Sequence, residues 1–171
     1  PALFSNFLNC FSYCKMIFNE KEQPIDFVYL EINDAFEKIT GLKRENIIGK
    51  RVTKAIPHTE TDHPELIDLY GKVALNGQEE RIEIFFKPLS MWLHISVYSP
   101  EKGYFIAIFE DITKRKTLET ALIRSEERYR VITDSLPEIV FEMDNRGKLT
   151  YVNKKGFELT GYTQEDFEKG V

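Results

Sequence analysis

The sequence contains few of the residue types that mark several functional classes. Among 171 residues there are two cysteines, three histidines and one tryptophan, and acidic residues outnumber basic ones to give a net charge of −5. Proteins that bind nucleic acid or an anionic membrane generally carry a basic face, so this balance predicts neither partner. No apolar run approaches the roughly 18 residues of a membrane-spanning helix, and no signal peptide is recognisable. We therefore expect no membrane contact by this stretch of chain.

The two cysteines, Cys10 and Cys14, are four residues apart. A metal or redox pair is one interpretation of this spacing. We favour the other, in which they are two small apolar residues at a helix-to-strand junction. Cysteines this sparse are typical of a reducing compartment, and the expected location is the cytoplasm.

No motif of a catalytic site is present. The sequence has no glycine-rich phosphate loop and no serine in a nucleophile-elbow motif. His58 and His63, flanked by Glu60 and Asp62, are candidate metal ligands, but a polar loop that leads into a helix is the favoured explanation. We expect no metal and no catalysis by this chain, and a free-standing α+β enzyme is the weakest alternative.

What the sequence does contain is a long-period repeat. Residues 33–42, NDAFEKITGL, are echoed 120 positions later by residues 153–162, NKKGFELTGY. Each copy follows a β-rich run with a tyrosine and precedes a short acidic helix candidate. Solenoid repeats recur every 20–50 residues or so, and a period this long therefore indicates tandem domains.

The apolar pattern predicts an α+β unit in residues 1–113. Helical spacing predicts a helix over residues 2–10, and further helices are expected between residues 33 and 76. The expected strands are residues 13–18, 25–32, 79–86, 91–98 and 104–110. Strands at both ends with helices between them indicate one antiparallel sheet with helices on one face. Since the last two strands are apolar on both faces, the N-terminal helix, a partner subunit or both must cover the second face.

From Thr113 the pattern changes to a long charged helix that ends before Pro137. Its apolar side is spaced 4-3-4-3-4, the seam of a coiled coil, at Leu118, Leu122, Ser125, Tyr129, Ile132 and Leu136. A lone amphipathic helix that packs on its own sheet would show the same spacing over so few heptads. We favour a homodimer with Leu118, Leu122, Tyr129 and Ile132 in its seam.

Three strings together resemble the PAS domain family. DITKRK, residues 111–116, resembles the closing signature of PAS domains; SEERYR, residues 125–130, resembles the lead-in to a following PAS domain; and the repeated word resembles the PAS core motif. The resemblance covers essentially the whole chain. It implies an α+β PAS fold, with a five-stranded antiparallel sheet in the order 2-1-5-4-3 and helices on one face, followed by a long connecting helix. Residues 1–113 would be a complete PAS domain, 114–136 the connector helix, and 137–171 the N-terminal part of a second, truncated PAS domain.

The resemblance also implies a role. It predicts a sensory and dimerisation module of a prokaryotic multi-PAS signalling protein, with a sensor histidine kinase as the favoured parent and a cyclic-dinucleotide cyclase or phosphodiesterase as an alternative. Input would pass through Asp111, Ile112 and Thr113 into the connector helix and on to an output domain outside this chain. The rival interpretation is a structural spacer that binds no ligand.

A PAS pocket lies between the sheet and the central helices. The candidates to line it here are Cys14, Met16, Leu66, Tyr70, Trp92, His94 and Ser96. Ordinary core packing explains each of them more simply, and His94 in particular is expected to be buried and neutral with one hydrogen bond.

The residues that mark the known cofactor classes of the family do not identify a ligand for this chain. The oxygen-sensing haem class carries a histidine in the helix that ends here at Gly77, but the matching position is apolar, close to Leu66. His63 lies a turn earlier, before a proline, which argues against haem. The blue-light flavin class carries a reactive cysteine in the central helices, and residues 33–76 contain none, which excludes a covalent flavin adduct. A non-covalent flavin stays an open alternative that no residue of the sequence favours.

Overall fold

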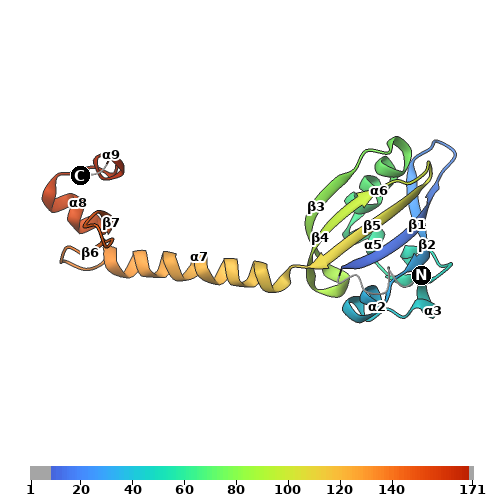
Figure 1. Cartoon of the computed structure of the whole chain (residues 1–171), viewed down its shortest axis with the longest axis horizontal. Coiled ribbons are helices and arrows are strands. Elements are labelled where there is room, and N and C mark those ends of the chain that lie inside the picture. Colours follow the sequence, from blue (N-terminus) through green and yellow to red (C-terminus); the bar gives the residue numbers. More distant parts are fainter. Residues whose placement is uncertain (1–8, 170–171) are drawn as a thin grey trace. The chain divides into compact units, whose positions relative to one another are not determined.

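The computed structural model describes residues 9–169, and the chain forms two compact units, Pro1–Lys116 and Thr117–Val171. The first unit contains one antiparallel sheet in the order β2-β1-β5-β4-β3 (Figure 1). Its strands are β1 (Cys10–Phe18), β2 (Pro24–Ile32), β3 (Glu80–Phe86), β4 (Met91–Tyr98) and β5 (Tyr104–Asp111). The predicted fold class and strand order are confirmed.

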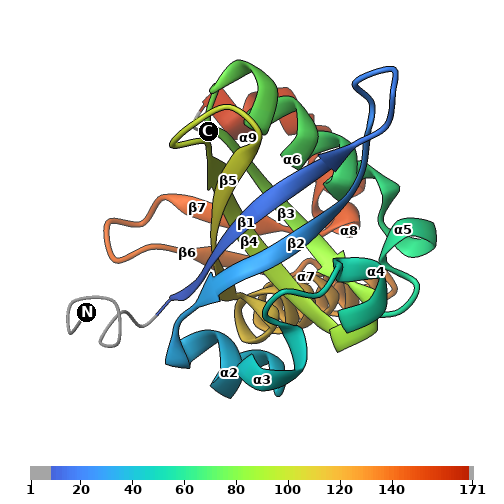
Figure 2. The ribbon, with the colours of Figure 1, turned by 90° about the vertical axis from the view of Figure 1, so that its right-hand side faces the viewer.

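Helices between β2 and β3 lie together on one side of this sheet (Figure 2). They are α2 (Asp34–Thr40), α3 (Arg44–Ile47), α4 (Val52–Ala55), α5 (Thr59–Asp62) and α6 (Pro64–Asn76), and a short 3₁₀ turn, η1 (Lys87–Leu89), joins β3 to β4. Helix α6 contacts four of the five strands, β1, β2, β4 and β5. It is therefore the main helical cover of the sheet.

Local sequence signals set the ends of the helices. The Asn33 side chain caps α2 by accepting a hydrogen bond from the Phe36 N–H at 3.0 Å. Gly41 ends the same helix in the left-handed region, at φ 74°, where a side chain would be strained. Helix α6 begins with Pro64, whose fixed φ suits a first helical turn, and ends at Gly77 in the same left-handed conformation.

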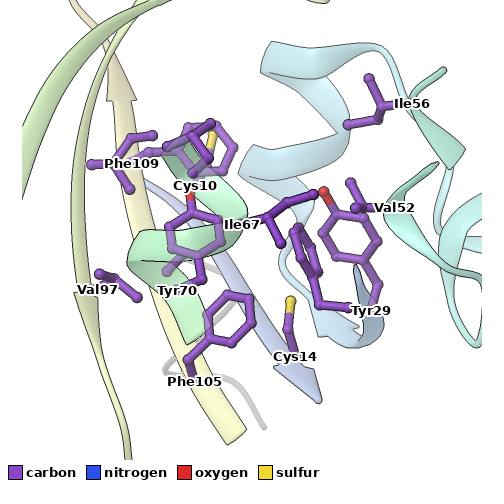
Figure 3. Close-up of a cluster of buried hydrophobic side chains, with 14 of the residues drawn as sticks. Cys10, Cys14, Tyr29, Val52, Ile56, Ile67, Tyr70, Val97, Phe105 and Phe109 are labelled. Carbon is purple, nitrogen blue, oxygen red and sulfur yellow. The ribbon is translucent and has the colours of Figure 1, made fainter. Parts of the chain in front are cut away.

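The core between sheet and helices contains a cluster of aromatic rings among its aliphatic side chains, with Tyr29, Tyr70, Phe105 and Phe109 in view in Figure 3. Phe27 on β2 lies edge-on to Tyr29, Tyr70 and Phe105, with ring centroids 5.2–5.6 Å apart. Tyr70 also stacks on Phe105 at 4.7 Å. Edge-on and offset ring pairs add to the free energy of burial.

The opposite face of the sheet is only half-covered. Trp92, Tyr104, Ile106 and Ile108 are each of intermediate exposure there. The helix predicted over residues 2–10 lies outside the described residues, except at its end. At residue 10 the helix prediction is wrong, because Cys10 is the first residue of strand β1 and pairs with Phe109 on the neighbouring strand β5.

The second unit contains most of the connector helix α7 (Thr113–Asp134), 22 residues and about 33 Å long. The hairpin β6 (Phe141–Met143) and β7 (Leu149–Val152) follows it, and then α8 (Lys154–Thr160) and α9 (Gln164–Lys169). Within residues 9–169, no helix combines the length and apolarity that a membrane crossing needs.

Candidate ligand pocket and signal-transfer junction

A cavity of about 50 Å³ lies between the sheet and the helices of the first unit. The sheet contributes Leu93 and Ile95 from β4 and Phe105, Ala107 and Phe109 from β5. The helices contribute aliphatic and aromatic side chains, with Leu66 and Tyr70 from α6 among them. Among the described residues, the lining contains no Lys, Arg, His, Asp or Glu, and these residues bring no charge to the cavity.

The seven predicted pocket residues divide into three groups. Leu66 and Tyr70 line the cavity. Cys14 and Met16 are buried in the adjoining core, where Cys14 is completely covered. The remaining three, Trp92, His94 and Ser96, lie on the other face of β4.

The assignment of Trp92, His94 and Ser96 to the pocket is therefore wrong. Side chains alternate along a strand, and on β4 the buried set is Leu93, Ile95 and Val97. Because both sets contain apolar residues, the pattern did not show which set faces the helices. The expectation that His94 is buried also fails, since its side chain is 36% exposed and its Nδ1 lies 3.2 Å from Glu110 Oε1 on β5.

Most polar groups of the lining already have backbone partners. The Ser12 hydroxyl donates to Ala107 O at 3.4 Å, that of Thr40 to Phe36 O at 2.6 Å, and that of Thr59 to Ile56 O at 2.7 Å. The phenols of Tyr29 and Tyr70 are the other hydroxyl groups of the lining. Burial raises the pKa of both phenols, so both are protonated at neutral pH.

His63 has a structural role that the sequence analysis missed. It is 4% exposed, stacks on Phe86 at 4.9 Å, and its Nε2 accepts a hydrogen bond from the Lys87 N–H at 3.1 Å. Its Nδ1 lies 3.0 Å from Glu65 Oε1, which fixes the ring orientation. His58, by contrast, is exposed. In the described part of the chain no three potential metal ligands converge. The spacing of His63 before a Pro-initiated helix carried no signal of this contact.

The end of β5 is tied to β4 where the connector begins. The Ile112 N–H donates to Trp92 O at 2.8 Å, and the Trp92 N–H donates to Thr113 Oγ1 at 2.8 Å. Asp111 Oδ1 accepts from the Thr113 N–H at 2.8 Å. The three predicted signal-transfer residues thus join the first turn of α7 to the strand that supplies Leu93 and Ile95 to the cavity.

An ion-pair cluster holds the same turn to β3. The two carboxylate oxygens of Glu83 receive Arg115 at 2.6 Å and Lys116 at 2.7 Å. Their hydrogen bonds lower the pKa of Glu83 to about 2. The Lys116 ammonium also lies over the Trp92 ring, 5.3 Å from its centroid. We refer to Glu83, Arg115 and Lys116 as the clamp.

Family models of the PAS domain match residues 16–114, more than half of the chain, and residues 127–170. The chain belongs to the PAS domain family. The junction described above is therefore the point where a PAS sheet continues into its C-terminal helix.

Three similar proteins illustrate the relationship. The oxygen sensor protein DosP of Escherichia coli is 26% identical over 95% of this chain and 20% of its own length. Sporulation kinase E of Bacillus subtilis is 33% identical over 33% of this chain and 8% of its length. A domain of a sensory box sensor histidine kinase/response regulator from Geobacter sulfurreducens has 15% identity and a TM-score of 0.47, over 64% of this chain and 89% of that one. The chain spans about a fifth of the length of curated relatives such as DosP.

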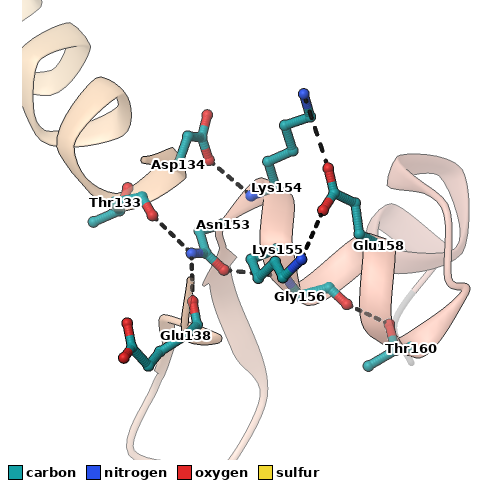
Figure 4. A network of polar contacts seen from close by, with 9 residues as sticks. All are labelled: Thr133, Asp134, Glu138, Asn153, Lys154, Lys155, Gly156, Glu158 and Thr160. Carbon is teal, nitrogen blue, oxygen red and sulfur yellow. Dashed lines mark hydrogen bonds and ion pairs between the residues drawn. The ribbon is translucent and has the colours of Figure 1, made fainter. Parts of the chain in front are cut away.

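The second PAS match contains an asparagine that repeats the role of Asn33. In Figure 4, Asn153 Oδ1 accepts from the Gly156 N–H, and its Nδ2 donates to Thr133 O at 2.7 Å and Glu138 O at 3.0 Å. The same Oδ1 also accepts from the Val140 N–H at 3.0 Å. Asn33 likewise caps its helix while it binds the backbone of Phe11 and Asn9. In the second copy, this network ties the last turn of α7 to the start of α8.

The seam residues of α7 are exposed. Leu118, Leu122, Tyr129 and Ile132 have between 44% and 61% of their surface accessible. Four large side chains with this exposure on one helix form an apolar stripe that another helix can cover.

Proposed function

We propose that this chain is a cytoplasmic sensory and dimerisation module of a signal-transduction protein, with a sensor histidine kinase as the favoured parent. Input is received in the cavity of the first unit and leaves through α7 to an output domain. The observation that carries the proposal is the pair of hydrogen bonds at Trp92. They connect the strand lining the cavity to the first turn of the connector.

The mechanism follows from this connection. A ligand that contacts Leu93 or Ile95 differently in two arrangements of β4 also changes the position of Trp92. Because both backbone groups of Trp92 bond to Ile112 and Thr113, the change reaches α7 within one residue. Signalling requires that the two helix states differ in their affinity for the ligand.

Relatives support the class of parent. Sporulation kinase E and DosP are, by their names, a kinase and an oxygen sensor. We keep a cyclic-dinucleotide cyclase or phosphodiesterase as an alternative parent. This chain itself would serve as a regulatory segment without a reaction of its own.

We assign residues 1–113 to one PAS module, 114–136 to the connector and 137–171 to the N-terminal part of a second module. The PAS matches at 16–114 and 127–170 support two modules. The four exposed seam residues of α7 support a parallel homodimer through the connector.

The cavity favours a small ligand over a large cofactor. Its volume of about 50 Å³ is far below that of a site for haem or flavin, since ligand pockets for drug-sized molecules occupy roughly 300–1,000 Å³. We therefore propose that neither is bound.

Native mass spectrometry of gently purified protein tests the sensor against the spacer. A dimer that retains a small molecule supports the sensor. A dimer that retains no small molecule supports the spacer, provided that substitutions in the cavity leave the amide hydrogen exchange of the connector helix α7 unchanged.

A further inference from the structure

Two phenol groups in the cavity lining have no hydrogen-bond partner among the residues that the structure describes. No described residue accepts a hydrogen bond from the hydroxyl of Tyr29 or Tyr70. Both residues are buried, with only 5% of Tyr29 and 7% of Tyr70 exposed. Every fully enclosed side-chain nitrogen or oxygen in residues 9–169 does have a partner. The two phenol oxygens therefore border open space, as their place in the lining requires.

The two phenols come from different elements and line the same cavity. Tyr29 lies on β2 and Tyr70 on α6, and both rings contact Phe27. Figure 3 shows both in the buried cluster with Cys14 and Phe105. Burial is the main cause of the raised pKa of Tyr29, and the negative charge of an ionised Tyr70 would raise it further.

The chemistry of the lining restricts the ligand. A protonated phenol can donate one hydrogen bond, and a buried donor left without an acceptor costs free energy. None of the described lining residues is charged, so they would offer a buried ion no counter-charge. A neutral molecule with an acceptor oxygen or nitrogen satisfies both conditions.

The volume of the cavity limits the size of the ligand. A water molecule needs about 10–15 Å³ of such space, so the cavity of about 50 Å³ holds roughly three to five atoms of that size. We propose that the cavity binds a neutral molecule of three to five non-hydrogen atoms, mostly apolar, whose acceptor atom takes a hydrogen bond from the phenol of Tyr29 or Tyr70. This proposal rests on the sensory function proposed above and names the ligand class of that site.

Acetone and 2-methylpropene form a matched pair of probes. Each has four non-hydrogen atoms in the same shape, but only acetone carries an acceptor. Amide and ring shifts of the full chain in a sealed NMR tube report binding of each probe at millimolar concentration, because ligands this small bind weakly. The substitutions are Tyr29→Phe and Tyr70→Phe, with Tyr104→Phe on the opposite sheet face as the control.

The expected result is saturable shifts at cavity residues, with acetone bound about three- to tenfold more tightly than 2-methylpropene. At least one of Tyr29→Phe and Tyr70→Phe should weaken acetone binding by a similar factor and leave 2-methylpropene binding unchanged, and Tyr104→Phe should alter the binding of neither probe. Unchanged acetone binding in both phenol variants would overturn the proposed hydrogen bond. Equal binding of the two probes would overturn the acceptor-bearing ligand while leaving a sensory cavity in place. Shifts from neither probe would overturn the ligand class, and the Trp92 junction would then be judged by its own measurements.

Discussion

The backbone N–H of Trp92 donates a hydrogen bond to the Thr113 hydroxyl at 2.8 Å. The Trp92 carbonyl accepts a hydrogen bond from the N–H of Ile112, the residue before Thr113. Both backbone groups of one β4 residue thus hold the first turn of α7. Leu93, its neighbour in sequence, faces the cavity. A displacement of this strand is therefore transmitted to the connector through hydrogen bonds.

Thr113→Val removes the acceptor for the Trp92 N–H while keeping the side-chain shape. We expect the free energy of unfolding of the first unit to fall by about 1–2 kcal/mol, because a half-buried donor loses its partner. Urea unfolding followed by fluorescence measures this well, since Trp92 is the only tryptophan in the chain. Thr150→Val, at an exposed position of β7, is the control and should leave the midpoint in place.

The clamp predicts a specific response to acid. Hydrogen bonds from Lys116 and Arg115 lower the pKa of Glu83 to about 2, so the ionised form is favoured in the folded state. The stabilisation is present above the ordinary carboxyl pKa near 4.5 and is lost as the pH falls from there through about 2.

Glu83→Gln should therefore reduce stability at pH 7 and flatten the stability profile between pH 4.5 and 2. Stability measured across this range, against Glu31→Gln at an exposed β2 position, checks the prediction. A profile for Glu83→Gln with the same slope as the parent would show that the clamp contributes nothing.

The exposed stripe on α7 predicts dimerisation. Leu122→Asp places a charge in the seam twice per dimer, and we expect the dimer dissociation constant to rise by at least about tenfold. Sedimentation equilibrium measures it, and Ala121→Asp adds the same charge one position away from the seam. The seam is wrong if both variants dimerise as the parent does, or if both weaken equally.

Asn153 is completely buried and makes four side-chain hydrogen bonds. Asn153→Ala removes them all, and we expect the local free energy of opening to fall by at least about 2 kcal/mol. Hydrogen exchange at the N–H groups of Val140 and Gly156 reports the loss. Asn145→Ala, in the exposed β6–β7 turn, should leave their protection intact.

The cysteines should be unreactive in the folded protein. Burial raises the pKa of the Cys10 thiol to about 12 and that of Cys14 further, so almost no thiolate exists at pH 8. Ellman's reagent should detect neither thiol in the native chain and both in guanidinium. Rapid modification of one native thiol would indicate that β1 opens easily.

Sequence patterns identified the elements better than they identified the site. The repeated word marked Asn33 and Asn153, and both cap a helix and bind the preceding backbone, because capping depends on local residue chemistry. The DIT string marked the junction through the family resemblance, because the contacts that Ile112 and Thr113 make with Trp92 on β4 join segments about 20 residues apart and leave no local pattern.

The pocket prediction chose the wrong face of strand β4. Leu93 and Trp92 belong to alternate sets on β4, both apolar, and only the position of α6 determines which set is inside. Tyr29 and Glu83 were missed because their roles depend on segments far away in sequence: Tyr29 shares its cavity with α6, and Glu83 pairs with Arg115. No local spacing records such contacts.

A double-mutant cycle tests the central claim, that cavity strand and connector are coupled. Leu93→Val alters the cavity, Thr113→Val breaks the junction, and the readout is the free energy of opening at the Lys116 amide, which donates to Ile112 O at 3.0 Å in the first turn of α7. Leu66→Val, which alters the cavity from α6, replaces Leu93→Val in the control cycle. Coupling predicts that Leu93 and Thr113 are non-additive by more than about 0.5 kcal/mol while Leu66 and Thr113 add. Additivity in both cycles would contradict transmission through Trp92.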